Sequence, residues 1–152
     1  ADKDNSVLVG HSAGGHLALW AAGRDRIEAG EALYRENPFM PRAVIGLAAI
    51  TDLEDYAGGD NSCQRVTPEL MGGGPAERPG RYAQAAPVAQ GTSIPTVLLQ
   101  GSADAIVPPD QARALPSAEL RLIEGAGHFD LVHPATPAFQ VLLAALDEVL
   151  GR

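Results

Sequence analysis

The feature that most constrains this chain is a glycine-rich turn between an apolar run and a helix-like stretch. Residues 10–15 read Gly-His-Ser-Ala-Gly-Gly, and they stand between an apolar run at 7–9 and the sequence His-Leu-Ala-Leu-Trp-Ala-Ala at 16–22. A strand that turns sharply into a helix around a central serine raises the serine hydroxyl above the edge of a sheet. The pattern therefore predicts a strand over 6–9, a helix over 16–22 and a reactive hydroxyl at Ser12.

Such a turn brings the residues two before and two after the serine close together. Glycine at both places leaves room for this approach, because it carries no Cβ atom. We therefore expect Gly10 and Gly14 to provide that room.

Length and composition fit a single globular domain. The chain has 152 residues, 45% of them hydrophobic, and no apolar run approaches the roughly 18 residues that cross a bilayer. Its formal net charge is -8, and its 11 basic residues form no cluster that could neutralise phosphates. We expect neither a membrane span nor a nucleic-acid partner. The only cysteine, Cys63, lies in a polar stretch that predicts a loop thiol.

The remaining chain alternates strands with helices. Further strands are predicted over 43–49, 96–100 and 120–123, and further helices over 109–115 and 137–150. The first two of these strands, like the strand over 6–9, are continuous apolar runs, which is typical of parallel strands covered on both faces. The pattern predicts the α/β class, with a mostly parallel sheet flanked by helices.

Residues 51–91 interrupt this alternation. Glycines and prolines recur there so densely that long regular elements are excluded. At about 40 residues the segment is too long for an ordinary connection. We interpret 51–91 as an irregular insertion over the site that could act as a lid, with short helices near 68–71 and 79–86.

A serine hydroxyl is a weak nucleophile, so it needs a base within hydrogen-bond reach and a third group that orients the base. The candidate acid is Asp104, after the strand over 96–100, and the candidate base is His128, after the strand over 120–123. Residues that follow parallel strands meet at one edge of the sheet. The chain order Ser12, Asp104, His128 is also the order found with a serine on this kind of strand–turn–helix motif.

Other residues compete for these roles. Asp52 also follows a strand, and it could serve as the acid or cap a helix at the start of the insertion. His133 precedes a proline, which favours an extended or turn conformation, and we interpret it as a surface residue. His11 and His16 are expected to pack or hydrogen-bond rather than act as bases. The histidines lack the His-Glu-x-x-His spacing of a zinc site.

These motifs together resemble the C-terminal half of the α/β-hydrolase fold. The run Gly-His-Ser-Ala-Gly-Gly-His-Leu-Ala at 10–18 is similar to the nucleophile elbow of hormone-sensitive-lipase-like esterases, kynurenine-formamidase-like hydrolases and their feruloyl-esterase-like relatives. Residues 68–73, 81–82 and 86–87 resemble the segment before the acid strand in the same group. The resemblance covers essentially the whole chain and implies that residues 1–152 form one partial hydrolase domain.

The resemblance implies a serine hydrolase, with a carboxylesterase as the leading interpretation. Ser12 would attack the carbonyl of a small ester or amide substrate, His128 would move the proton and Asp104 would orient His128. The N–H of Ala13 would serve the oxyanion hole and His11 would bind substrate, and neither a cofactor nor a metal is implied.

Three alternatives remain open: an arylformamidase, a peptidase of the prolyl-oligopeptidase type, and a non-catalytic hydrolase-like domain for binding or assembly. A cytoplasmic location is the default expectation.

The chain departs from this family at its front. Members carry a His-Gly-Gly type loop after an early strand, and its N–H groups complete the oxyanion hole; no such loop precedes Gly10. The loss of one such donor typically lowers the rate by about 10² to 10³. We therefore expect a fragment, whose sheet is completed by a missing N-terminal half or by another chain, for example in a homo-oligomer.

This expectation can be tested on the isolated 152-residue chain. The strand over 6–9 would then be an edge with unpaired N–H and C=O groups, so we expect the chain to be poorly soluble or oligomeric in analytical sedimentation. A monodisperse monomer that unfolds cooperatively would contradict the expectation.

Overall fold

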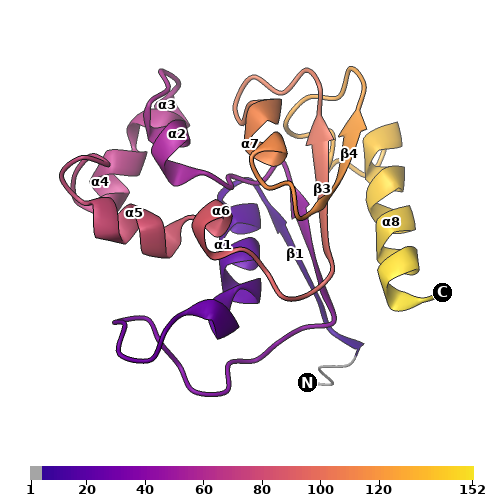
Figure 1. The fold of residues 1–152 in the computed structure, drawn as a ribbon. Coiled ribbons are helices and arrows are strands. Elements are labelled where there is room, and N and C mark those ends of the chain that lie inside the picture. Colours follow the sequence, from indigo (N-terminus) through magenta and orange to yellow (C-terminus); the bar gives the residue numbers. More distant parts are fainter. Residues whose placement is uncertain (1–4) are drawn as a thin grey trace.

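Four parallel strands form the centre of the structure, a computed structural model that describes residues 5–152 (Figure 1). The strands are β1 (Val7–His11), β2 (Ala43–Leu47), β3 (Thr96–Gly101) and β4 (Glu119–Ile123). They pair in the order β1-β2-β3-β4, and every pairing is parallel. The predicted parallel sheet and α/β class are therefore confirmed.

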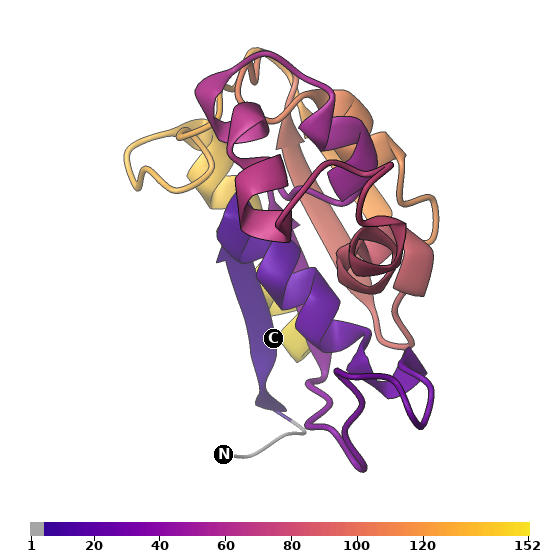
Figure 2. The ribbon, with the colours of Figure 1, turned by 90° about the vertical axis from the view of Figure 1, so that its left-hand side faces the viewer.

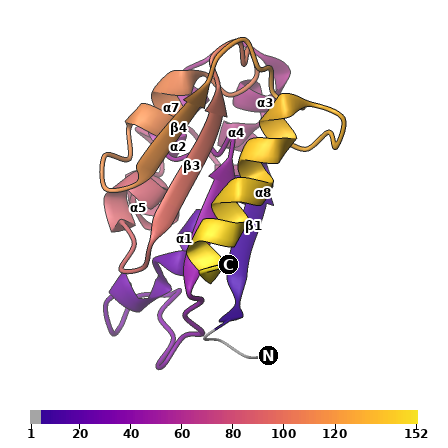
Figure 3. The same cartoon turned by 90° about the vertical axis from the view of Figure 1, so that its right-hand side faces the viewer.

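Helices cover both faces of this sheet. They are α1 (Ala13–Ala22), α2 (Leu53–Ala57), α3 (Ser62–Arg65), α4 (Thr67–Met71), α5 (Pro79–Ala85), α6 (Pro87–Gln90), α7 (Pro109–Arg113) and α8 (Pro137–Leu150), with a short 3-10 helix, η2 (Arg24–Arg26). Figure 3 shows α8 along one face of the sheet, and α1 lies on the opposite face. None of the helices between residues 5 and 152 combines the length and apolar character needed to cross a bilayer.

The core follows from the alternation of side chains along the central strands. Val44 and Leu98 pack with Leu19 of α1 on one face, whereas Ile45 and Leu99 belong to the cluster that contains the buried side chains of α8 on the other. All residues of β2 and β3 are buried. Two covered faces explain why these strands read as continuous apolar runs.

Most predicted bounds hold within three residues, and two differences have clear causes. The strand predicted over 43–49 ends at Leu47, because Ala48 adopts a φ of 46° and leaves the extended conformation. The helix predicted over 16–22 begins three residues earlier, at Ala13. Its first turn contains Gly14 and Gly15, which favour a turn by composition but are helical here.

The insertion predicted over 51–91 folds into five short helices, α2 to α6. The short helices predicted near 68–71 and 79–86 are confirmed as α4 and α5, whereas α2, α3 and α6 were not predicted. The breakers do prevent long elements, since the longest of the five, α5, has seven residues. Capping explains how two of the short helices form. The Asp52 carboxylate accepts the N–H groups of Glu54 and Asp55 at the start of α2, and Asn61 and Gln64 form a capping box on α3.

The same segment is packed onto the domain. Leu53, Tyr56, Met71 and Tyr82 are buried members of the main core cluster. Figure 2 shows the helices of this segment beside α1, and side chains of α2, α3 and α4 share a cavity with the first turn of α1. Residues 51–91 therefore contribute to the core and to the carboxyl edge of the sheet.

Gln111 of α7 anchors the start of this segment. Its side chain is buried, and its Oε1 atom accepts the backbone N–H groups of Thr51 and Asp52, each at 3.0 Å. Its Nε2 atom donates to the Asp55 carboxylate at 2.8 Å. One glutamine therefore satisfies two backbone donors where the chain leaves the sheet for α2.

Replacement of Gln111 by leucine keeps the size of the side chain but leaves the Thr51 and Asp52 N–H groups without their acceptor. We expect the variant to lose about 1–3 kcal/mol of unfolding free energy for a donor that stays buried, measured by urea denaturation. Gln140→Leu, at an exposed position of α8, is the control and should change stability by less than about 0.5 kcal/mol. Equal effects would contradict the anchoring role.

Candidate active site

Ser12 occupies a strained turn between β1 and α1. Its φ of 57° and ψ of -121° lie outside the conformations that non-glycine residues ordinarily adopt. Two hydrogen bonds hold the turn: the Ser12 N–H donates to the Leu47 carbonyl at 2.8 Å, and the His16 N–H donates to the Ser12 carbonyl at 3.0 Å. A serine before a helix usually caps it, but the Ser12 side chain makes no such bond. Its hydroxyl is therefore available for chemistry.

Close backbone contacts explain two of the glycines in this turn. A Cβ atom at Gly10 would lie 2.1 Å from the carbonyl oxygen of Gly14, and one at Gly15 would lie 2.7 Å from the Cβ atom of Ala49. A Cβ atom at Gly14 would meet nothing within 4 Å. The expectation for Gly10 is confirmed. For Gly14 it is wrong, because its carbonyl, rather than its side-chain position, faces Gly10.

Asp104 and His128 lie in the loops that follow β3 and β4, and the structure joins them. The Nδ1 atom of His128 donates to Oδ2 of Asp104 at 2.8 Å, and both side chains are buried, with exposures of 5% and 0%. With its Nδ1 proton engaged in this way, a neutral His128 has an unprotonated Nε2 atom. That is the tautomer a general base needs.

Three further donors fix the Asp104 carboxylate. Its Oδ1 atom accepts the N–H groups of Ile106 at 2.8 Å and Val107 at 2.9 Å. Its Oδ2 atom also accepts from Nε2 of Gln100 at 3.3 Å. The carboxylate is therefore held in one orientation by three contacts that do not involve His128.

The loop of His128 returns across the carboxyl edge of the sheet toward the serine turn. The Nε2 atom of His11, the residue before Ser12, donates to the His128 carbonyl at 2.9 Å, and the two imidazole rings lie 4.5 Å apart between centroids. The ring of Phe129 packs edge-on against His128 at 5.0 Å. Within residues 5–152 the Ser12 hydroxyl makes no hydrogen bond to His128, and such bonds often tighten only when substrate binds.

His11 was expected to bind substrate, and the structure instead gives it a contact with the histidine loop. Burial lowers the pKa of the His11 imidazole, while the hydrogen bond to the His128 carbonyl opposes that shift. Burial therefore favours the uncharged form of His11. Its contact with substrate stays a prediction.

The N–H group of Ala13 begins α1. Within residues 5–152 it donates no backbone hydrogen bond, and the N-terminus of a ten-residue helix favours negative charge. Its role as an oxyanion donor stays a prediction.

The competing residues have other partners. Asp52 caps α2, as its alternative interpretation predicts. His133 is exposed and accepts the N–H of Ala135 at 3.2 Å. The Nδ1 atom of His16 donates to the Ile50 carbonyl at 3.2 Å, and burial lowers the pKa of its ring. Across residues 5–152 there is no group of three or more His, Cys, Asp or Glu side chains that could hold a metal ion.

Sequence reasoning missed three residues that support the acid. Gln100 is fully buried, and besides Asp104 it donates to the Val107 carbonyl at 3.1 Å. Tyr56 and Asn61 both donate to the Ile106 carbonyl, at 3.1 Å and 2.9 Å. The only sequence signal was a glutamine at the end of an otherwise apolar strand. Burial, with smaller contributions from the nearby groups of Cys63 and Asp104, raises the pKa of Tyr56 to about 12, so its hydroxyl stays a donor.

A cavity of about 200 Å³ opens beside Ser12 and Ala13. Its other walls include Ile50 and side chains of α2, α3 and α4, with Leu53, Tyr56 and Leu70 among them. The insertion is thus part of the site.

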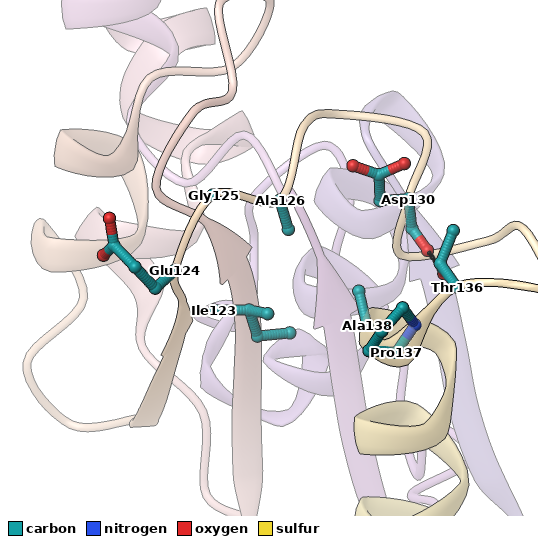
Figure 4. Close-up of a pocket in the computed structure, with 8 residues that line it drawn as sticks. All are labelled: Ile123, Glu124, Gly125, Ala126, Asp130, Thr136, Pro137 and Ala138. Carbon is teal, nitrogen blue, oxygen red and sulfur yellow. Dashed lines mark hydrogen bonds between the residues drawn. The ribbon is translucent and has the colours of Figure 1, made fainter.

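A second cavity, of about 270 Å³, lies between the end of β4 and the start of α8 (Figure 4). Ile123 and Ala138 approach each other across it, and Glu124 points away. None of Ser12, Asp104 and His128 lines this space. Of these two cavities, only the one beside Ser12 includes one of these three candidate residues.

A parallel sheet with a strained serine turn and an acid–histidine pair at its carboxyl edge defines an α/β-hydrolase. The BD-FAE family model matches residues 1–118, and the chain belongs to this esterase-type family of α/β-hydrolases.

Solved structures show the same fold. The thermophilic esterase Est2 of the Planctomycetes species Thermogutta terrifontis is 24% identical, with a TM-score of 0.67 over 99% of this chain and 55% of that chain. Esterase B of Lactobacillus Rhamnosis is 17% identical, with a TM-score of 0.75 over 99% of this chain and 54% of that chain. Puromycin hydrolase is 24% identical, with a TM-score of 0.68 over 99% of this chain and 23% of that chain. The chain thus spans about half the length of the two esterases. No match was found among the curated proteins.

Gly10 and Gly14 offer a matched test of the turn. Gly10→Ala places a methyl group against the Gly14 carbonyl, so we expect it to cost at least about 1–3 kcal/mol of unfolding free energy, measured by urea denaturation. Gly14→Ala meets open space in a helix and should leave stability unchanged or slightly higher. A Gly14→Ala variant as unstable as Gly10→Ala would contradict the described turn.

Proposed function

We propose that this chain carries the reacting side chains of a serine hydrolase that cleaves carboxylic esters through an acyl-enzyme. The observation that carries the proposal is the buried hydrogen bond between Asp104 and His128. The His128 loop is in turn joined to His11, the neighbour of Ser12. In this proposal Ser12 is the nucleophile, His128 the general base and Asp104 the residue that orients it.

The reaction proceeds in two halves. As the Ser12 hydroxyl oxygen attacks the ester carbonyl carbon, the Nε2 atom of His128 takes its proton, and the carbonyl oxygen becomes an oxyanion that accepts the Ala13 N–H. The intermediate then expels the alcohol, which receives the proton from His128, and an acyl-serine remains. Water attacks this ester in the same way and releases the carboxylic acid.

Asp104 contributes by stabilising the positive charge that forms on His128 and by fixing the orientation of the His128 ring. Its carboxylate stabilises the imidazolium that forms on His128 and keeps the Nδ1 proton in place, without itself taking up the proton. The N–H groups of Ile106 and Val107 keep the carboxylate from turning during this step. Because of these contacts, the Asp104 carboxylate keeps its position relative to His128 while the proton moves.

The Ala13 N–H supplies only one oxyanion donor. The removal of a single donor in such a site costs about 10² to 10³ in rate. We propose that the complete site adds a donor from outside residues 5–152. Ester rather than amide substrates are supported by membership in an esterase-type family.

The proposal is tested by the kinetics of p-nitrophenyl ester hydrolysis with variants of the full-length protein. Ser12→Ala and His128→Ala should lower kcat/KM by about 10⁴ or more, and Asp104→Asn by about 10⁴. Asp52→Asn keeps a good helix cap and, like His133→Ala, should change kcat/KM by less than about twofold.

Each control variant tests one competing assignment, His133 as the base or Asp52 as the acid. If His128→Ala and His133→Ala lowered kcat/KM equally, the assignment of His128 as the base would be wrong. If Asp104→Asn and Asp52→Asn lowered kcat/KM equally, the assignment of Asp104 as the acid would be wrong. A Ser12→Ala variant with full activity would overturn the proposed mechanism.

A further inference from the structure

We infer that the cavity beside Ser12 receives the acyl group of the ester rather than its alcohol. We further infer that the substrates are esters of short, unsubstituted carboxylic acids with about four to six carbons. The inference rests on the proposed function. It adds the substrate class, and it assigns the selection of substrates to the part of the site that binds the acyl group. It is carried by the lining of the cavity, by its volume and by the partners of its polar side chains.

The residues that line the cavity indicate which half of the ester occupies it. The cavity contains the nucleophile Ser12 and the oxyanion donor Ala13, but neither His128 nor Asp104 lines it. The leaving alcohol must lie near His128, because that imidazole returns the proton to it. The part of the substrate that extends from the carbonyl away from His128 is the acyl group. The cavity is therefore on the acyl side of the reacting carbon.

The volume limits the length of the acyl group. The cavity measures about 200 Å³, and an apolar protein cavity of about 150 Å³ is known to bind benzene, which has six carbons. A butanoyl to hexanoyl chain therefore fills the space. An acyl chain longer than hexanoyl does not fit inside the cavity, so its end must extend beyond the residues at the rim.

The partners of the polar side chains indicate a hydrocarbon chain. Apart from the nucleophile Ser12 and the weakly donating thiol of Cys63, the lining holds three side chains that could donate hydrogen bonds. Each of these three donates to a backbone carbonyl instead. His16 donates to Ile50, Tyr56 to Ile106 and Thr67 to Cys63. Among residues 5–152, no Asp, Glu, Lys or Arg side chain lines it. An acyl group with hydroxyl, methoxy or carboxylate substituents would lose its hydration there without a donor in return.

Leu70 of α4 lies at the rim of the cavity. It lines the cavity, yet 80% of its surface is exposed, so its substitution disturbs little of the core. Leu70→Ala opens the acyl end of the cavity, and Leu70→Trp narrows it. Leu33, an exposed leucine outside the cavity, provides the control Leu33→Ala.

The experiment measures kcat/KM for p-nitrophenyl acetate, butanoate, hexanoate, octanoate and dodecanoate with the full-length protein. A second series keeps the butanoyl group and exchanges p-nitrophenol for 1-naphthol. A third compares methyl butanoate with a methyl hydroxycinnamate. We expect a maximum at butanoate or hexanoate, about a fourfold gain for each methylene that enters the cavity, and a preference for butanoate over hydroxycinnamate.

In Leu70→Ala the ratio of octanoate to butanoate should rise by about tenfold or more, and in Leu70→Trp it should fall. The ratio of p-nitrophenyl to 1-naphthyl butanoate should change by less than about twofold in either variant, and Leu33→Ala should alter neither ratio.

Two results would overturn the inference while the proposed function stands. One is Ser12-dependent hydrolysis in which Leu70 variants change the leaving-group ratio rather than the chain-length ratio. The other is Ser12-dependent hydrolysis with a higher kcat/KM for the hydroxycinnamate than for methyl butanoate, or with a kcat/KM that does not depend on the length of the acyl chain. Absence of Ser12-dependent hydrolysis of any of these esters would overturn the proposed function, and the inference with it.

Discussion

The common direction of the four strands is the constraint on which the rest of the structure depends. Because all four are parallel, their carboxyl ends meet at one edge, and the chain leaves that edge at Ser12 after β1, at Asp104 after β3 and at His128 after β4. Strands β1 and β4 are not neighbours, so the His128 loop must run back across the edge. Its contacts with Asp104 and His11 fix that path.

The segment 51–91 completes this edge. Tyr56 and Asn61 hold the Ile106 carbonyl, and the Ile106 N–H holds the Asp104 carboxylate, so the insertion and the acid loop support each other. The same segment provides six of the ten described residues that line the cavity beside Ser12. A substitution in α2 to α4 can therefore change the shape of the cavity, or disturb the loop that holds Asp104.

Local patterns in the sequence were sufficient for the strands, for α8 and for the pairing of Asp104 with His128, because each depends on a continuous apolar run or on the order of loops along the chain. They also placed α4 and α5 correctly, but they were insufficient for α2, α3 and α6. Those helices are too short to show a period, and they are stabilised by caps such as Asp52 and by the burial of distant side chains such as Tyr56. The role of Gly14 was mistaken for a related reason, since the direction of its Cβ position depends on the helix that begins beside it. The cavity could not be foreseen, because its walls come from separate parts of the chain.

The reactivity of Ser12 toward a fluorophosphonate probe tests the central claim most directly, because the probe forms a stable adduct only with a serine that a nearby base activates. In the full-length protein, mass spectrometry should locate one adduct, on the peptide that contains Ser12, and His128→Ala and Asp104→Asn should slow its formation strongly. A folded protein that leaves Ser12 unlabelled, or that is labelled equally fast without His128, would contradict the account.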